Sequence, residues 1–329
     1  MSKNKLAKKS PEATSNFGIK FIQICFYILF FVTPLLLWPF TSEVFEFNKM
    51  IFVYLMTTII ASAWAFRTFQ NQKLEFVRTP LDLPLLLFLL SQIISTVISI
   101  NSHTSLWGYY SRFHGGLVST ICYTLLFYAF VTHFHQKEKE IKTVIHSILI
   151  SASLTAIFGV LEHFGIDKHI WVQDVQNRVF STLGQPNWLS AYLIAIVPLS
   201  LHLSISNRAS QASPLRWGYL FLTFLFLITI TYTKSQSGLA ATAIVLILAF
   251  IYYAKKYSVL LIPLFLISLV IPQTRNYGLR TLNSLNNINP FYSDSLTIAK
   301  KENETRIGGS DSMIIRRVVW DGAIKLGLA

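Results

Sequence analysis

Long apolar blocks alternate with short polar segments along most of this chain. A transmembrane helix needs about 20 consecutive, mostly apolar residues. Nine blocks fit this requirement, and they run roughly over residues 18–40, 50–66, 82–100, 117–134, 143–163, 188–205, 217–233, 238–254 and 258–272. The last block is the weakest of the nine, because it is short and contains Pro263 and Pro272. The pattern predicts an all-α, polytopic membrane protein with about nine transmembrane helices and long extracytoplasmic loops.

Composition agrees with a membrane protein and excludes several other classes. Hydrophobic residues make up 53% of the 329-residue chain and charged residues only 13%, with a mean hydropathy of +0.50. A soluble domain has about 25% charged residues. A soluble globule, a disordered chain, a coiled coil and a disulfide-rich secreted module are therefore excluded. Cys25 and Cys122 both lie inside apolar blocks, which argues against a disulfide framework or a metal site.

The basic residues indicate how the chain is oriented. With the N-terminus in the cytoplasm, the inner segments contain fifteen Lys and Arg residues and the outer loops before the last span contain five. This bias follows the positive-inside rule and predicts a cytoplasmic tail over residues 1–17, a transmembrane domain over 18–272 and an extracytoplasmic segment over 273–329. The net charge is +13, and the basic residues that cause it lie between the apolar blocks. We therefore expect contacts with membrane lipids and none with nucleic acid.

The predicted outer loops contain the candidate chemistry, since the inner loops have no nucleotide or metal motif. Outward helix N-termini present free N–H groups and a positive dipole end, which suit phosphate. The sixth span starts after Gly184, where Asn187 is suited to cap the helix, and the eighth starts near Ser235. Arg178 lies upstream and could bind a diphosphate in a bidentate manner. The alternative is that Arg178 and Asn187 only anchor the loop at lipid headgroups.

Three other outer features have a structural alternative beside the functional one. Arg112 follows Tyr110 closely and is typical of interface anchoring as well as of ligand binding. His169 has no carboxylate or Cys partner at ligand spacing, so it does not indicate a metal site. Glu162 and His163 end the fifth span near the predicted outer interface, where a carboxylate can stay hydrated, with a proton relay as the alternative.

Three segments resemble motifs of a known family and follow one another in the same order as in that family. They are RVFSTLGQPNWLSAY from Arg178, TYTKSQSGLAA over residues 231–241, and IRRVVWDGAI over residues 315–324. Together with the upstream SLWGYYSRFHGG, they resemble the bacterial O-antigen ligase and O-antigen polymerase-like membrane proteins over about residues 80–329. Arg316 stands four residues before Trp320, as in the family's Arg-x-x-x-Trp segment, and Gln236 stands where the family often has Arg.

The resemblance implies a GT-C-like glycosyltransferase at the outer face of a bacterial cytoplasmic (inner) membrane, in cell-surface polysaccharide synthesis. The donor would be a glycan on polyprenyl (undecaprenyl) diphosphate, and the acceptor a lipid, a glycan or a protein, without a cofactor or metal. Arg178 and Arg316 match the arginines that handle the diphosphate, whereas Gln236 leaves a third cationic contact in doubt. The expected substrate-binding residues are Arg317, Asn187, Gln185, Ser235, Gln236, Arg112 and His169.

Other functions stay open on the sequence alone. A transporter or flippase for lipid-linked saccharides, or a non-catalytic assembly subunit, would share the same polytopic pattern. The family places a His–Asn pair beyond its Arg-x-x-x-Trp segment, and this chain ends nine residues after Trp320. We therefore expect the chain to be C-terminally truncated, ending in an incomplete helix, with the catalytic base beyond residue 329. The alternative is that His169 acts as the base.

Overall fold

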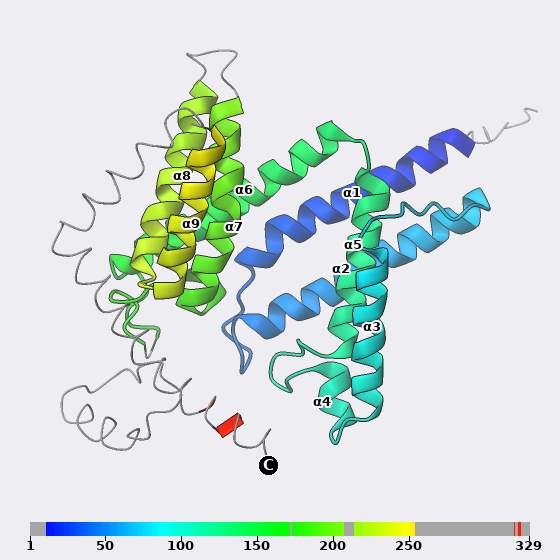
Figure 1. Cartoon of the computed structure of the whole chain (residues 1–329), viewed down its shortest axis with the longest axis horizontal. Helices are drawn as coiled ribbons and strands as arrows, with labels where there is room; N and C mark the ends of the chain where they lie inside the picture. Colours follow the sequence, from blue (N-terminus) through cyan, green and yellow to red (C-terminus); the bar gives the residue numbers. More distant parts are fainter. Residues whose placement is uncertain (1–10, 172, 207–213, 254–318, 320–321, 324–329) are drawn as a thin grey trace, which may run out of the picture. The chain divides into compact units, whose positions relative to one another are not determined.

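The computed structural model describes residues 11–171, 173–206, 214–253, 319, 322 and 323. Contacts divide the chain into residues 1–249 and residues 250–329, and all the helices discussed below begin in the first unit. The described residues contain only helices and connecting segments (Figure 1). The elements are α1 (Pro11–Leu35), α2 (Glu46–Asn71), α3 (Asp82–Val97), α4 (Ser102–Trp107), α5 (Leu117–Phe134), α6 (Glu138–His163), η1 (Ser181–Leu183), α7 (Pro186–Ser206), α8 (Pro214–Tyr232) and α9 (Gln236–Tyr253).

Seven of these helices are long and apolar enough to cross a membrane: α1, α2, α5, α6, α7, α8 and α9. They make the described part of the chain an all-helical, multi-pass membrane protein, as predicted. α3, which corresponds to the predicted third span, is apolar but only 16 residues long. The ninth predicted span, over residues 258–272, lies outside the described residues.

Most helices follow the apolar blocks, and the departures have local causes. α5 has the predicted bounds, because Gly116 precedes it in an extended conformation and a polar segment follows it. α2 begins at Glu46, four residues before the predicted start. The carboxylate of Glu43 accepts hydrogen bonds from the N–H groups of Phe45 and Phe47 at this end, so the first turn forms ahead of the apolar block.

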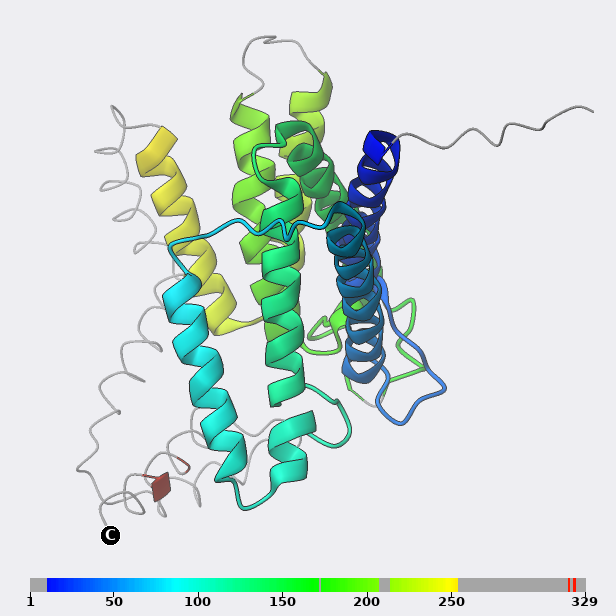
Figure 2. The ribbon, with the colours of Figure 1, turned by 90° about the vertical axis from the view of Figure 1, so that its right-hand side faces the viewer.

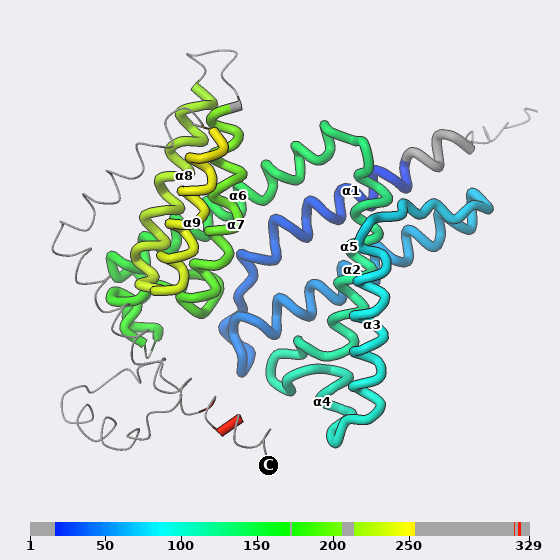
Figure 3. The backbone as a smooth tube through the Cα atoms, viewed as in Figure 1, coloured from blue at the N-terminus to red at the C-terminus, as the bar shows by residue number. Residues whose placement is uncertain are grey.

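Two apolar clusters hold the helices together. In the first cluster, Phe26 of α1 packs edge-on against Phe134 of α5, with ring centroids 5.6 Å apart, among side chains of α1, α2, α5 and α6. The second cluster lies among α6, α7 and α8, and it includes the fully buried Leu193 and Phe226. α7 packs along α8 in this cluster, and α1 contacts both α2 and α6 (Figures 2 and 3).

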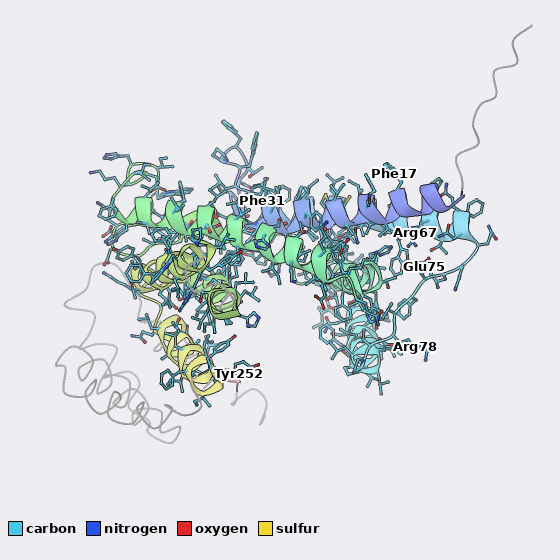
Figure 4. All side chains as sticks on the ribbon, turned by 90° about the horizontal axis from the view of Figure 1, so that it is seen from above. Phe17, Phe31, Arg67, Glu75, Arg78 and Tyr252 are labelled. Atoms are coloured by element: carbon cyan, nitrogen blue, oxygen red, sulfur yellow. The ribbon has the colours of Figure 1, made fainter. Side chains whose placement is uncertain are left out.

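A charged network lies at the C-terminal end of α2. Arg67 is buried, and its Nη2 donates to Glu75 at 2.6 Å (Figure 4). Its Nη1 lies 3.3 Å from Nε2 of His133 on α5, whose Nδ1 lies 2.8 Å from the carbonyl oxygen of Ala129. The carbonyl only accepts and the guanidinium only donates, so His133 is the neutral imidazole with its proton on Nδ1. This network joins the ends of α2 and α5 that lie opposite the candidate site.

Candidate functional site

The candidate site lies at the helix ends opposite the network of Arg67 and His133. Four connecting segments are found there: those between α1 and α2, α4 and α5, α6 and α7, and α8 and α9. Lys49, near the start of α2, donates to the carbonyl oxygen of Thr182 at 2.6 Å. Phe45, just before α2, packs its ring against Trp171 and Phe180 of the long loop between α6 and α7. These contacts join two of the predicted outer loops, which are far apart in sequence.

The loop between α6 and α7 runs beside the short turn between α8 and α9. The N–H of Val179 donates to the carbonyl oxygen of Tyr232 at 3.3 Å, and Nε of Arg178 donates to that of Thr233 at 3.1 Å. Nζ of Lys234 donates to Oδ1 of Asn177. Arg178 and Lys234 are therefore held next to each other by neighbouring residues of two paired segments.

Arg178 also reaches the first turn of α7, where its Nη2 donates to Oδ1 of Asn187 at 3.2 Å. Arg178 and Lys234 are both exposed, and neither forms an ion pair with a carboxylate among the described residues. By contrast, Arg67 and Arg112 each pair with a glutamate. Arg178 and Lys234 come from neighbouring segments and are held by neutral oxygens, so their positive charges favour an anion at this place.

Lys234 was missed by the sequence analysis, which looked for a cation at position 236. A signal was available in the charge pattern. Only five Lys and Arg residues fall in the predicted outer loops before the last span, against the positive-inside bias. Lys49, Arg112, Arg178 and Lys234 are four of these five, and all four lie at this end of the helices.

Glu162 fixes the base of the loop that carries Arg178. Its side chain is fully buried, and Oε2 accepts hydrogen bonds from the N–H groups of Phe180 at 2.9 Å and Ser181 at 2.7 Å. The hydroxyl of Ser181 donates to the carbonyl oxygen of Thr155 on α6 at 2.7 Å. The expectation of a hydrated carboxylate was wrong, because the loop folds back over the end of α6 and covers it.

Of the two predicted helix caps, one is confirmed and one is wrong. Oγ of the buried Ser235 accepts the N–H of Gly238 at 3.2 Å, which caps α9. Asn187 is not a cap, because α7 already begins at Pro186, a residue suited to the first helical position. The residue before that start is the half-buried Gln185, whose carbonyl oxygen accepts hydrogen bonds from the first turn of α7.

Arg112 lies in the turn between α4 and α5, and its Nε is 3.2 Å from Oε2 of Glu46 on α2. Its guanidinium carbon lies 5.7 Å from the ring centroids of both Tyr109 and Trp188. Trp188 follows Asn187 in the first turn of α7. The same turn of one helix therefore contacts both Arg112 and Arg178.

The remaining predicted site residues are exposed or lie outside the described residues. His169 is exposed, and no contact within the described part of the chain joins it to Arg178. Gln236, the first residue of α9, is also exposed. Arg316 and Arg317 lie outside the described residues.

A metal-binding cluster is not found among the side chains that the structure describes. The site thus consists of cations, amides and aromatic rings around the first turns of α7 and α9.

No protein-family model, curated protein or solved structure matches the chain.

Proposed function

We propose that this protein is an O-antigen ligase-like glycosyltransferase with a GT-C-like architecture of about nine spans. It would transfer a glycan from polyprenyl diphosphate to a lipid, glycan or protein acceptor at the outer face of a bacterial cytoplasmic membrane. The observation that carries the proposal is the pair of adjacent, carboxylate-free cations, Arg178 and Lys234, at the first turn of α7. A diphosphate is an anion of high charge that such a pair can bind.

The chemistry requires the leaving group to accept charge. The acceptor hydroxyl oxygen attacks the anomeric carbon of the donor, and the bond from that carbon to the diphosphate oxygen breaks. The diphosphate leaves with the bonding electron pair, while the hydroxyl proton passes to a base. Arg178 would stabilise the growing negative charge through two parallel N–H groups, and Lys234 would add a point charge beside it.

The test is consumption of a polyprenyl-diphosphate oligosaccharide by the complete enzyme, purified in lipid nanodiscs. Arg178→Ala is expected to lower turnover about 100-fold or more, since it removes a charge-stabilising donor. Arg178→Lys should rescue poorly, because an ammonium group lacks the bidentate geometry. Arg78→Ala is the matched control, as Arg78 is also exposed but lies in the connection between α2 and α3, at the other helix ends.

The outcomes separate the alternatives. Near-wild-type turnover in Arg178→Ala would show that the site assignment is wrong. Movement of the intact lipid-linked glycan across the bilayer, without its consumption, would replace the transferase by a flippase. Equal losses in Arg178→Ala and Arg78→Ala would mean that the effect does not depend on the place of the arginine, and would also overturn the site assignment.

A further inference from the structure

The turn between α4 and α5 is rigidly built. Gly108 has a φ of +86°, and a Cβ there would collide with the backbone of His114. The N–H of Tyr109 donates to the carbonyl oxygen of His114 at 3.2 Å, and the N–H of Phe113 donates to that of Tyr109 at 2.8 Å. The hydroxyl of Tyr54 on α2 donates to the carbonyl oxygen of Phe113, which fixes the turn to the helices.

The aromatic side chains of this turn divide into inner and outer ones. Phe113 packs against Phe47 of α2, with ring centroids 5.7 Å apart. Tyr109 and Tyr110 are instead 52% and 74% exposed, with ring centroids 4.9 Å apart. Trp188 on α7 is 38% exposed. These three exposed rings, which we call the aromatic cluster, belong to backbone that is already ordered.

Polar groups border the aromatic cluster. Arg112 lies over the rings of Tyr109 and Trp188 and is 3.2 Å from the carboxylate of Glu46. A sugar ring has one face of C–H groups, which stacks on aromatic rings, and a rim of hydroxyls that both donate and accept hydrogen bonds. Exposed rings beside the guanidinium of Arg112, whose side chain is 43% exposed, match the C–H face and the acceptor oxygens of a saccharide.

We propose that the aromatic cluster binds the saccharide portion of the lipid-linked donor. The inference rests on the proposed function, because it takes the saccharide to be the one attached to the diphosphate. Asn187 contacts Arg178, and its neighbour Trp188 contacts Arg112. A diphosphate held by Arg178 would therefore place its first sugars next to Trp188.

A membrane-interface belt is the other common use of exposed Tyr and Trp. Two observations favour a saccharide. The largely buried carboxylate of Glu46 pairs with Arg112 and offsets its positive charge, which weakens any attraction of Arg112 for anionic headgroups. Arg112 also covers part of the faces of Tyr109 and Trp188, so its guanidinium is held at the rings by both of them rather than extended toward headgroups.

The test compares binding of two lipids to the full chain in nanodiscs. One is undecaprenyl diphosphate carrying a neutral pentasaccharide of hexoses and N-acetylhexosamines, and the other is undecaprenyl diphosphate without sugar. Tyr110→Ala is expected to weaken binding of the glycan-bearing lipid about fivefold and Trp188→Ala about tenfold. Binding of the sugar-free lipid should not change, and Tyr110→Phe should bind like the wild type, because it keeps the ring.

Tyr252→Ala is the matched control. Tyr252 is 69% exposed and its ring centroid lies 4.9 Å from that of Tyr253, like the Tyr109–Tyr110 pair, but it is at the other end of α9. Equal weakening for both lipids, or no weakening in Tyr110→Ala and Trp188→Ala, would overturn the saccharide site.

The proposed function fails in a different way. If Arg178→Ala leaves binding of the sugar-free lipid unchanged, the diphosphate site is wrong, whereas a glycan-dependent loss in Trp188→Ala still supports the saccharide site. If the wild type binds the two lipids equally well, the saccharide site is wrong and the diphosphate site stands. Binding of neither lipid by the wild type would overturn both.

Discussion

Glu162→Ala should release the loop that carries Arg178. The substitution removes the acceptor of two N–H groups, those of Phe180 and Ser181, at residues that are only 2% and 1% exposed. A buried donor left without a partner costs about 1–3 kcal/mol, so two of them cost about 2–6 kcal/mol. Glu162→Gln keeps a carbonyl oxygen in nearly the same place and should cost about 2 kcal/mol or less.

Hydrogen exchange of the loop measures this effect locally. Since 1.4 kcal/mol corresponds to a factor of ten, protection of the Phe180 and Ser181 amides should fall by about 30-fold or more in Glu162→Ala. Glu138→Ala is the control, because the side chain of Glu138 is 88% exposed and makes only a 3.9 Å pair with Lys142 on the same helix. Unchanged protection in Glu162→Ala would refute the role of Glu162 as the fixed base of the loop.

Two further predictions concern packing and orientation. In Gly238→Ala, the new Cβ would lie 1.7 Å from Oγ of Ser190, so we expect the free energy of unfolding to fall by about 1–3 kcal/mol in a thermal unfolding assay. Adding Ser190→Gly should largely restore it. An unchanged free energy of unfolding in the single variant would contradict the contact between α7 and α9. In a chain without its native cysteines, Ser111→Cys should react with a membrane-impermeant maleimide on intact cells and Asn71→Cys only after permeabilisation, and the reverse pattern would place the site in the cytoplasm.

The helices were predictable because a membrane-length apolar run is a strong local signal. α5 has the expected bounds of residues 117–134, since Gly116 and the polar residues after Phe134 mark both ends. The start of α2 was not predictable in this way. It depends on the side chain of Glu43, which is not apolar and caps a turn that hydropathy leaves out.

The site was only partly predictable for a different reason. Arg178, Asn187 and Ser235 stand in segments with local features, namely a loop cation and two helix starts. The contact of Arg178 with Thr233 joins residues 55 positions apart, and nothing in either segment alone specifies it. The prediction that the carboxylate of Glu162 is hydrated was wrong for the same reason, because its burial depends on how the loop around Phe180 folds back over it.

α3 has a consequence for the membrane itself. Its 16 residues give a length of about 24 Å, which is shorter than a hydrocarbon core of about 30 Å, and none of its residues is buried by the protein. If α3 crosses the bilayer, it would create a negative hydrophobic mismatch, and the bilayer would thin beside it. α4 follows α3 and leads to the turn with Tyr109 and Tyr110. Thinning of the bilayer would thus bring the headgroup layer closer to these exposed rings. The diphosphate of a lipid-linked donor, which lies in that layer, would come closer to them as well.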